Sequence, residues 1–319
     1  VDLPGSNPCG EITLRSKQFC NLTAIVVRPT DTVADLKKKV KLSTILGTYQ
    51  ATLTHFGYLS KEWKNNCDDE ALLGVSITGY YDNKAIRNDK VLMNLKNESI
   101  KVNKEYAKKF GIKLSTCITT LKPHGNSGQL LHVGSGMHPW FAKYYIRRVR
   151  ISTNDSLFAL IKDQGVPFKA EVGYSTANST VAVVEFPMKA PEGAYTKDQV
   201  SALDLLHEWK RLKINYIEHN PSVTIYVGEN EWIEVANFIY ENWDIVGGLS
   251  FLPRSEHVYQ LAPYEEISEV EYEKRVKDIQ HIDFSKLMYY EQEDNTIGAK
   301  EIACVSGVCA IDDIMAEDA

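Results

Sequence analysis

A short segment near the start of the chain brings together residue types that could do radical or acid–base chemistry. Residues 7–12 read Asn-Pro-Cys-Gly-Glu-Ile, and a second cysteine, Cys20, follows eleven residues after Cys9. In an extended segment, the side chains of Asn7, Cys9 and Glu11 would point to the same side. An amide, a thiol and a carboxylate presented together suit chemistry on a hydroxylated substrate. Pro8 and Gly10 flank the thiol, as the tip of a tight loop would require.

A second pair of cysteines lies near the end of the chain. Cys304 and Cys309 form a Cys-x4-Cys pair in an acidic, polar stretch, with Ser306 and Gly307 between them. The pair could act as a shuttle dithiol on a flexible arm, which reduces a spent disulfide by thiol exchange. A zinc half-site or a surface pair without function is the alternative, although no second pair of ligands follows.

A polar, glycine-containing loop follows a predicted strand over residues 116–121. Such a loop can cradle phosphate oxygens with its backbone amides, although a glycine-rich loop is more often only a turn. The candidate phosphate-binding residues are Gly125, Asn126, Ser127 and Gly128.

These motifs together resemble the ribonucleotide reductases, and the segment from Asn7 to Leu22 resembles their radical-cysteine finger loop. The spacing between Cys9 and Cys20 is similar to that of the monomeric, adenosylcobalamin-dependent (class II) ribonucleoside-triphosphate reductases. The resemblance implies that Cys9 becomes the thiyl radical that removes the 3′-hydrogen of a ribonucleotide. It implies that Glu11 is the general base for the 3′-hydroxyl, held by Asn7. Cys20 would be half of the dithiol that reduces the 2′-position.

The same resemblance implies the cofactor, the partners and the fold. Adenosylcobalamin would generate the radical, a ribonucleoside triphosphate or diphosphate would be the substrate, and a thioredoxin-like protein would regenerate Cys304 and Cys309. The fold class is α/β, the C-terminal half of a ten-stranded barrel with the Cys9 loop at its centre. Residues 1–290 would form this barrel part, and residues 291–319 a flexible redox-active tail. No resident metal ion is expected.

The family's enzymes are about twice as long as this chain. The resemblance therefore places the second reducing cysteine in an N-terminal half that is absent here, and Cys67 and Cys117 are interpreted as structural. We expect the chain to be inactive without that half, which a split enzyme would supply as a partner.

The pattern of the chain predicts the elements that must position these residues. Apolar periodicity and caps predict helices over 32–54, 88–110, 196–212 and 230–243. Apolar runs predict strands over 22–27, 116–121, 144–151, 181–186, 222–227 and 247–252. Residues 71–79 form an apolar segment of small residues that suits close packing, and residues 65–70 are polar and loop-like. Strands that alternate with helices indicate a parallel α/β arrangement.

The composition excludes several classes of protein. The 319 residues carry a net charge of −6, which argues against a nucleic-acid-binding protein. No apolar run is long enough for a membrane helix, and no secretory signal opens the chain. Six cysteines scattered over a chain of this length indicate a reducing, cytoplasmic location.

Two other functions remain open from the sequence. One is the large subunit of an iron-dependent ribonucleotide reductase, which would need a radical-bearing partner subunit. The other is a nucleotide-binding protein descended from the reductases that has lost catalysis. The presence of Cys9, Glu11, Cys20 and the tail pair argues against the latter, because binding alone needs none of these groups.

Overall fold

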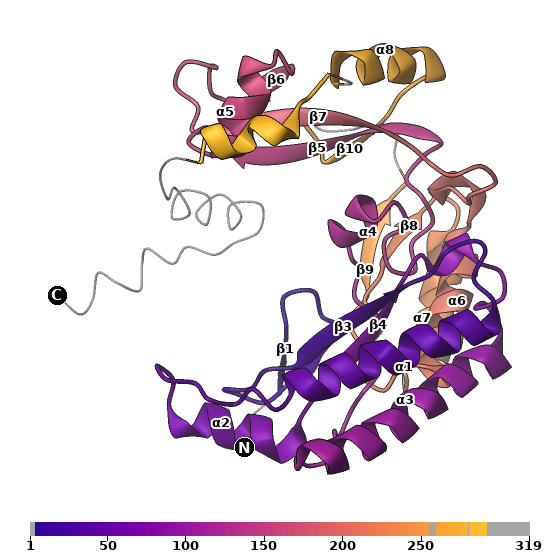
Figure 1. Cartoon of the computed structure of the whole chain (residues 1–319). Coiled ribbons are helices and arrows are strands. Elements are labelled where there is room, and N and C mark those ends of the chain that lie inside the picture. Colours follow the sequence, from indigo (N-terminus) through magenta and orange to yellow (C-terminus); the bar gives the residue numbers. More distant parts are fainter. Residues whose placement is uncertain (1–3, 255–259, 280, 292–319) are drawn as a thin grey trace. The chain divides into compact units, whose positions relative to one another are not determined.

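The computed structural model of the chain describes residues 4–254, 260–279 and 281–291. It divides into two compact units (Figure 1). Unit 1 comprises Val1–Trp140 and Gly193–Ser255, and unit 2 comprises Phe141–Glu192 and Glu256–Ala319. The barrel part predicted over residues 1–290 is therefore divided between two units, and the predicted tail falls almost wholly outside the described residues.

Unit 1 contains a series of parallel strands in sequence order. β3 (Asn21–Val26) pairs in parallel with β4 (Leu73–Thr78). Parallel bridges from Val75 to Thr119 and from Leu121 to Pro221 extend the series. β8 (Thr224–Val227) then pairs in parallel with β9 (Ser250–Pro253). This confirms the parallel arrangement predicted for the strand segments of this unit, and the apolar segment over residues 71–79 proves to be one more of these strands.

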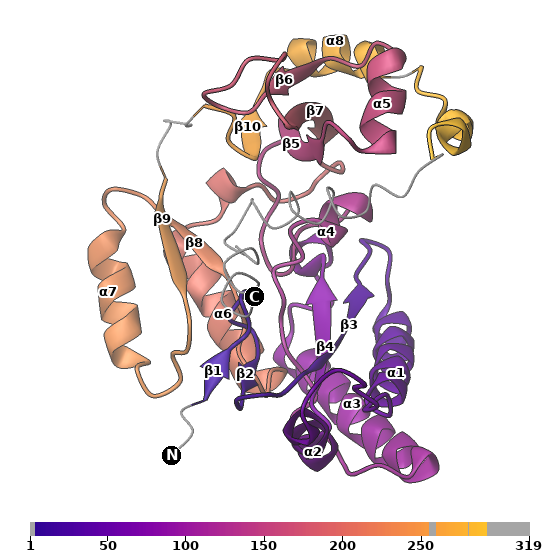
Figure 2. The ribbon, with the colours of Figure 1, turned by 90° about the vertical axis from the view of Figure 1, so that its left-hand side faces the viewer.

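Helices connect the successive strands of unit 1, as Figure 2 shows. They are α1 (Val33–Gln50), α2 (Lys61–Glu70), α3 (Asp89–Phe110), α6 (Ala202–Asn215) and α7 (Trp232–Glu241). The caps explain the bounds of two of them. The Thr32 side chain accepts a hydrogen bond from the Asp35 amide at the start of α1, and Gly111 ends α3 with a φ of +72°. Both helices match the prediction closely.

Large aromatic residues fix α6 against the strands. Trp209 and Tyr216 are fully buried in the core of unit 1. Burial of each side chain stabilises the folded state by roughly 2–3 kcal/mol. Their polar atoms are also paired with backbone. Trp209 Nε1 donates to the Pro221 carbonyl at 3.1 Å, and the Tyr216 hydroxyl donates to the Val75 carbonyl at 3.0 Å. The helix therefore holds two of the strands in place.

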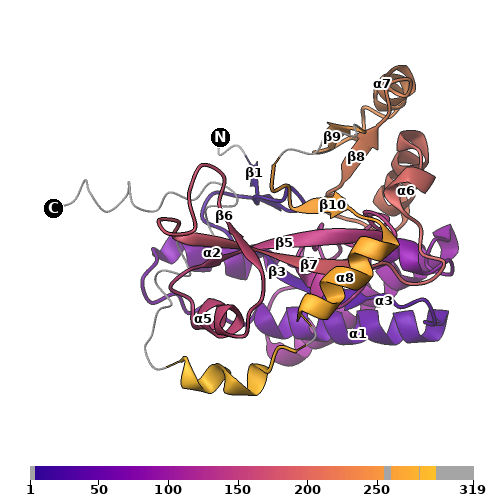
Figure 3. The same ribbon diagram turned by 90° about the horizontal axis from the view of Figure 1, so that it is seen from above.

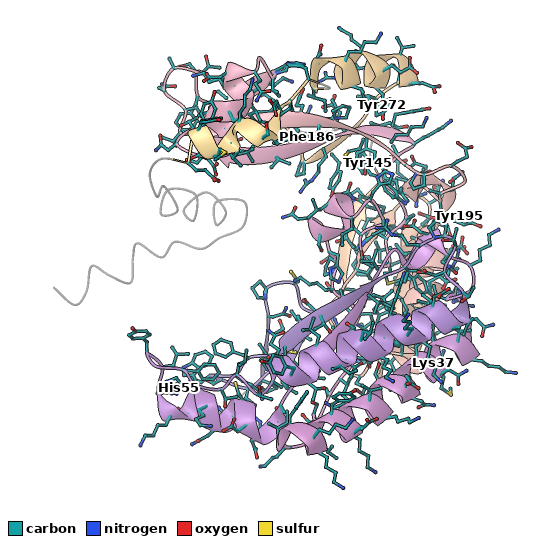
Figure 4. The ribbon with its side chains drawn as sticks, viewed as in Figure 1. Lys37, His55, Tyr145, Phe186, Tyr195 and Tyr272 are labelled. Carbon is teal, nitrogen blue, oxygen red and sulfur yellow. The ribbon has the colours of Figure 1, made fainter. Side chains whose placement is uncertain are left out.

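Unit 2 is built on an antiparallel sheet (Figure 3). The strand order is β10 (Tyr264–Glu266), β5 (Tyr144–Ser152), β7 (Val181–Lys189) and β6 (Phe168–Ala170). α5 (Ser156–Asp163) and α8 (Glu269–Ile279) belong to the same unit, and α8 carries Tyr272 (Figure 4). The Tyr272 ring packs 5.2 Å from the Tyr144 ring of β5. The strands predicted over 144–151 and 181–186 exist, but their assignment to a parallel sheet is wrong. These two strands, β5 and β7, are antiparallel neighbours that pair along their whole length, from Tyr144 opposite Lys189 to Ser152 opposite Val181.

Three local predictions need correction. Residues 65–70 are helical rather than loop-like and belong to α2. The sequence pattern hides this helix because it buries only Cys67 and is supported by ion pairs such as Lys64–Asp68. The capping box at Thr196 opens a 3-10 turn, η2 (Lys197–Gln199), and Ser201 caps α6 instead. The residue at the N-cap of α7 is Glu231 rather than Asn230.

Candidate active site

Cys9 lies at the tip of a hairpin formed by β1 (Gly5–Ser6) and β2 (Thr13–Leu14), which pair antiparallel. The Gly10 amide donates to the Asn7 carbonyl at 2.9 Å and closes a turn, with Gly10 at a φ of +75°. The interpretation of residues 7–11 as one extended segment is therefore wrong. Turn geometry rather than strand alternation exposes the Cys9 thiol.

Asn7 supports the hairpin from inside. Its side-chain oxygen accepts a hydrogen bond from the Ile12 amide at 3.0 Å, and its own amide donates to the Ile12 carbonyl at 3.2 Å. In this structure Asn7 thus holds the backbone next to Glu11. The resemblance implies a hydrogen bond from Asn7 to the Glu11 carboxylate, and the described residues do not form it.

Side chains from two adjacent strand ends bind the three carbonyl groups of Cys9, Gly10 and Glu11. Ser222 Oγ donates to the Cys9 carbonyl at 2.5 Å, and Asn220 Nδ2 donates to the Gly10 carbonyl at 2.9 Å. Thr120 Oγ1 donates to the Glu11 carbonyl at 2.8 Å. The parallel bridge between Leu121 and Pro221 places these three donors side by side. We call Thr120, Asn220 and Ser222 the carbonyl clamp.

The Glu11 side chain is 0% exposed and has one paired and one unpaired oxygen. Oε1 lies 3.2 Å from Lys122 Nζ, whereas Oε2 is buried without a hydrogen-bond partner. Lys122 Nζ also lies 3.4 Å from Cys9 Sγ. Burial by itself would lower the pKa of the Lys122 ammonium, but the neighbouring Glu11 and Cys9 outweigh it and raise that pKa. One ammonium therefore contacts both predicted catalytic groups.

Cys20 lies directly before β3 and is half-buried. Burial raises the pKa of its thiol strongly, and the charges of Glu11 and Cys117 act in the same direction. Because the thiolate is the nucleophilic form, Cys20 is held as a neutral thiol in this structure. Cys9, Cys20, Cys67 and Cys117 are all free.

Cys117 is close enough to influence Cys20 but is not placed to form a disulfide with it. The neighbour of Cys20, Asn21, pairs with Leu73 on β4, and the Leu73 amide donates to the Cys117 carbonyl at 3.0 Å. One strand thus lies between the two cysteines, a separation of about 9–10 Å. A disulfide needs Cα atoms within about 7 Å. Cys67 is buried in α2, where its sulfur accepts a hydrogen bond from the Phe19 amide.

The predicted phosphate loop is shaped by His124, which has a φ of +52°. Its Nε2 lies 2.9 Å from Ser76 Oγ and its Nδ1 lies 3.0 Å from Ser127 Oγ. Burial, with a further contribution from Lys122, lowers the pKa of His124 to about 4, so the ring is neutral near pH 7. The Gly128 amide donates to the His124 carbonyl at 2.9 Å, which makes Gly128 a structural member of the loop.

The remaining candidates in the loop lie on the surface. Gly125, Asn126 and Ser127 are exposed, and Ser127 begins the single turn α4 (Ser127–Leu130). Cys304 and Cys309 lie outside the described residues. In the part of the chain that the structure describes, no three His, Cys, Asp or Glu residues gather as metal ligands. No helix within the same residues has the length and apolarity needed to cross a bilayer.

The sequence alone does not single out Lys122 or the carbonyl clamp. These residues lie more than 100 positions from the hairpin along the chain. One signal was present for two of them, because Thr120 and Lys122 lie at the end of the strand predicted over residues 116–121, whereas Asn220 and Ser222 come before or at the start of the strand predicted over 222–227. In parallel α/β folds, ligand and catalytic groups gather at that end of the strands.

Comparison with known proteins supports the resemblance, although no family model matches the chain. The chain is 27% identical to the adenosylcobalamin-dependent ribonucleoside-triphosphate reductase of Lactobacillus leichmannii, across 87% of this chain and 41% of that protein. It is 27% identical to the enzyme of the same name from Lactobacillus acidophilus, across 97% of this chain and 45% of that protein. The chain thus spans less than half the length of these curated relatives.

Solved structures agree at the level of the fold. A crystal structure of a B12-dependent (class II) ribonucleotide reductase matches with a TM-score of 0.72 and 23% identity, over 92% of this chain and 44% of the other. The alpha subunit of the class Id ribonucleotide reductase of Actinobacillus ureae matches with a TM-score of 0.51 and 17% identity, over 79% of this chain and 53% of the other. The chain is therefore similar in sequence to the adenosylcobalamin-dependent ribonucleoside-triphosphate reductases, and it has a ribonucleotide-reductase-type α/β fold.

Proposed function

We propose that this chain carries the radical cysteine and the general base of an adenosylcobalamin-dependent ribonucleotide reductase, which reduces ribonucleotides to deoxyribonucleotides. One observation carries the proposal. The exposed thiol of Cys9 and the buried carboxylate of Glu11 share contact with the Lys122 ammonium, so the two groups lie close together. A thiol and a base must both reach the same sugar ring in this reaction.

Glu11 supplies the base through a specific atom. Oε1 is bound to Lys122, and Oε2 has no partner in the structure. A buried acceptor without a partner is costly, and a substrate hydroxyl would supply the missing hydrogen bond. We assign Oε2 as the oxygen that receives the proton of the 3′-hydroxyl.

Cys9 is the residue on which the radical would form. Adenosylcobalamin, when bound, supplies the radical that takes the thiol hydrogen. The exposure of Cys9 at a hairpin tip fits such a group, because a buried thiol would be out of its reach. The carbonyl clamp keeps the loop backbone fixed while the thiol gives up and recovers its hydrogen.

Cys20 is proposed as one half of the reducing dithiol. Loss of the 2′-hydroxyl takes two electrons, which two thiols supply as they form a disulfide. Since Cys117 is too distant and Cys67 is buried in α2, we assign the partner thiol to the part of the relatives that this chain does not cover. Cys304 and Cys309 would then reduce the disulfide and be regenerated by a thioredoxin-like protein.

The substrate would be a ribonucleoside triphosphate, as the names of the relatives indicate, with a diphosphate as the alternative. Gly125, Asn126 and Ser127 lie on the exposed side of the loop that follows Lys122, and we assign them to the substrate phosphates. Gly128 would act indirectly, by holding the loop shape through its hydrogen bond to His124.

The parallel strands of unit 1 would form half of a ten-stranded barrel, with a further polypeptide region supplying the other half. Among the described strands, β3 pairs with β4 alone. Its free side borders a groove of about 670 Å³ lined by β3 and by α1 residues including Leu42, Leu46 and Tyr49. An unpaired strand edge beside exposed apolar side chains is a surface suited to another strand and helix.

The test is an assay of the completed enzyme. The chain is combined with a polypeptide equivalent to the N-terminal part of the relatives, a ribonucleoside triphosphate, adenosylcobalamin and dithiothreitol. We expect deoxyribonucleotide from the wild type and none from Cys9→Ser. Nucleotide binding that survives in both proteins without any reduction would favour the non-catalytic alternative. Turnover that ignores adenosylcobalamin but requires a radical-bearing subunit would favour an iron-dependent enzyme.

A further inference from the structure

Lys122 occupies an unusual position, between the two groups proposed to act on the substrate. Its Nζ lies 3.2 Å from Glu11 Oε1 and 3.4 Å from Cys9 Sγ. Its side chain is 32% exposed, so the ammonium is partly shielded from water and its interactions are less weakened by solvent. Such a cation can act on the thiol and the carboxylate together.

The position of Lys122 is fixed by its own backbone. The Lys122 amide donates to Ser76 Oγ at 2.8 Å. A Cβ atom at Gly136 would lie 2.6 Å from the Lys122 carbonyl oxygen, and Gly136 has a φ of +58°. Only glycine suits that close approach, so the loop packs tightly where Lys122 leaves the strand. The backbone position from which the Lys122 side chain extends is therefore fixed.

Among the described residues, Lys122 is the cation that pairs with the Glu11 carboxylate. The Glu11 carboxylate has its ion pair with Lys122, and its other oxygen is unpaired. The nearby His124 ring is neutral near pH 7, because burial lowers its pKa to about 4. Removing the single counter-charge of a buried carboxylate leaves that charge uncompensated, which is strongly unfavourable.

We propose that Lys122 is a positioning residue that holds the Cys9 thiol and the Glu11 carboxylate as one unit and leaves Glu11 Oε2 as the proton acceptor. By binding Oε1, the ammonium keeps that oxygen away from the substrate and balances the buried charge. By donating to Sγ, it orients the sulfur of an otherwise exposed side chain. The catalytic meaning of this arrangement rests on the proposed function, but the arrangement itself can be tested without turnover.

The test compares two alkylating reagents at Cys9 of the full chain. Iodoacetate is an anion and iodoacetamide is neutral, and both react with the same thiol. Peptide mass spectrometry gives the rate at Cys9 for each reagent at one pH. An ammonium within about 4 Å of the sulfur favours the anion by about fivefold even in a water-like environment. The ratio of the two rates should fall by about that factor in Lys122→Met and be largely kept in Lys122→Arg.

The ratio separates charge from structure. A change in folding or exposure would alter both rates together and leave their ratio unchanged. Lys39→Met is the matched control, since Lys39 pairs with Asp31 elsewhere in unit 1 and should leave the ratio unchanged. An unchanged ratio in Lys122→Met, or an equal fall in Lys122→Arg, would overturn the proposal.

The completed enzyme provides the second measurement. If the wild type reduces nucleotide, Lys122→Met should lower kcat by at least tenfold with a smaller change in KM, and Lys122→Arg should restore part of kcat. Full activity in Lys122→Met would overturn the proposed role while leaving the reductase function intact. Absence of turnover in the wild type would instead count against the proposed function, and the alkylation ratio would still decide the contacts of Lys122.

Discussion

Glu11 is the residue whose surroundings most limit what it can do. Its carboxylate is fully buried, and one oxygen lacks a partner. Glu11→Gln keeps the shape of the side chain but removes the charge and the ability to take a proton. In the completed enzyme we expect kcat to fall by about 10²–10⁴-fold. Steady-state kinetics measure this loss.

The control for this variant is Glu11→Asp, which keeps the carboxylate one methylene further back and should retain more activity than Glu11→Gln. Circular dichroism of both variants checks that the fold is kept. Activity in Glu11→Gln within tenfold of the wild type would contradict the assignment of Glu11 as the base.

The thiols of the chain should differ sharply in reactivity. Burial and the nearby Glu11 charge raise the pKa of Cys20, so its thiolate is scarce until the solution is strongly alkaline. Cys9 is exposed at the hairpin tip. At pH 8 we expect iodoacetamide to modify Cys9 at least ten times faster than Cys20 in the native chain. Peptide mass spectrometry gives both rates, and unfolding in urea, as the control, should bring them together.

Residue types found together in one stretch could be predicted from the sequence, and residues brought in from a distance could not. Cys9, Glu11 and Cys20 could be proposed as candidates because they share a motif of fourteen residues from Asn7 to Cys20. Lys122 was not, because its approach to Cys9 depends on how the strand before it is placed. The turn at the tip was predictable in principle, since Pro8 and Gly10 are turn-forming residues.

At the scale of elements, the hairpin depends on the carbonyl clamp. Asn220 donates to the Gly10 carbonyl through its side-chain Nδ2 and to the Glu11 carbonyl through its backbone N–H. Asn220→Ala leaves the partly buried Gly10 carbonyl without that donor, a loss of roughly 1–3 kcal/mol. We expect faster hydrogen exchange at the Gly10 and Ile12 amides. Thr52→Ala, which removes an exposed hydroxyl that bonds within its own turn, should leave exchange in the hairpin unchanged. Unchanged exchange in Asn220→Ala would show that the clamp does not hold the loop.

The strands and helix of unit 2 are joined by an ionic cluster centred on Glu185 of β7. Burial acts to raise the pKa of Glu185, but hydrogen bonds from Lys169, Arg148 and Arg275 lower it to about 2 from an ordinary value of 4.5. A depressed pKa stabilises the folded state above pH 4.5, and this contribution is lost as the pH falls toward 2. Glu185→Gln should therefore speed hydrogen exchange in β7 at pH 7.

The difference between Glu185→Gln and the wild type should shrink as the pH is lowered through that range. Glu273→Gln, a change on α8, is the control for loss of one acidic residue in the same unit. A difference in exchange that stays constant from pH 7 to pH 3 would contradict the cluster's electrostatic role.

Element type was easier to predict than element partnership. The apolar runs over 144–151 and 181–186 are strands, but their residues do not reveal whether the neighbour runs parallel or antiparallel. α2 was misread because its stability comes from ion pairs and one buried cysteine, which leave no apolar stripe. By contrast, α1 and α3 have both a stripe and a cap, and their bounds were close to those predicted.

At the scale of the whole molecule, the sequence indicated the fold class and the similarity to the ribonucleotide reductases but not the division into two units. The antiparallel sheet is formed by a segment inserted between the third and fourth parallel strands, together with residues that follow β9. No change in composition marks these boundaries, because both units use ordinary apolar and charged residues. Only the pairing of distant strands reveals them.

The face beside β3 provides the prediction about assembly. α1 has two apolar stripes: Leu36 and Val40 face the core, whereas Leu42, Leu46 and Tyr49 are exposed next to the free side of β3. The chain spans 41–45% of the relatives it matches, so the proposed occupant is a strand and helix from the remaining region. Leu46→Asp places a charge in the middle of this groove, where its burial would be opposed.

We expect Leu46→Asp to weaken the binding of a polypeptide equivalent to that region by at least tenfold, with the melting temperature of the chain itself nearly unchanged. Titration calorimetry or analytical ultracentrifugation measures the affinity. Ile233→Asp is the matched control, because Ile233 is an exposed apolar residue on α7, outside the groove. Equal effects of the two changes would mean that the groove is not the contact surface. A selective effect of Leu46→Asp would explain why an apolar stripe that the core of unit 1 does not use lies on a helix next to an unpaired strand.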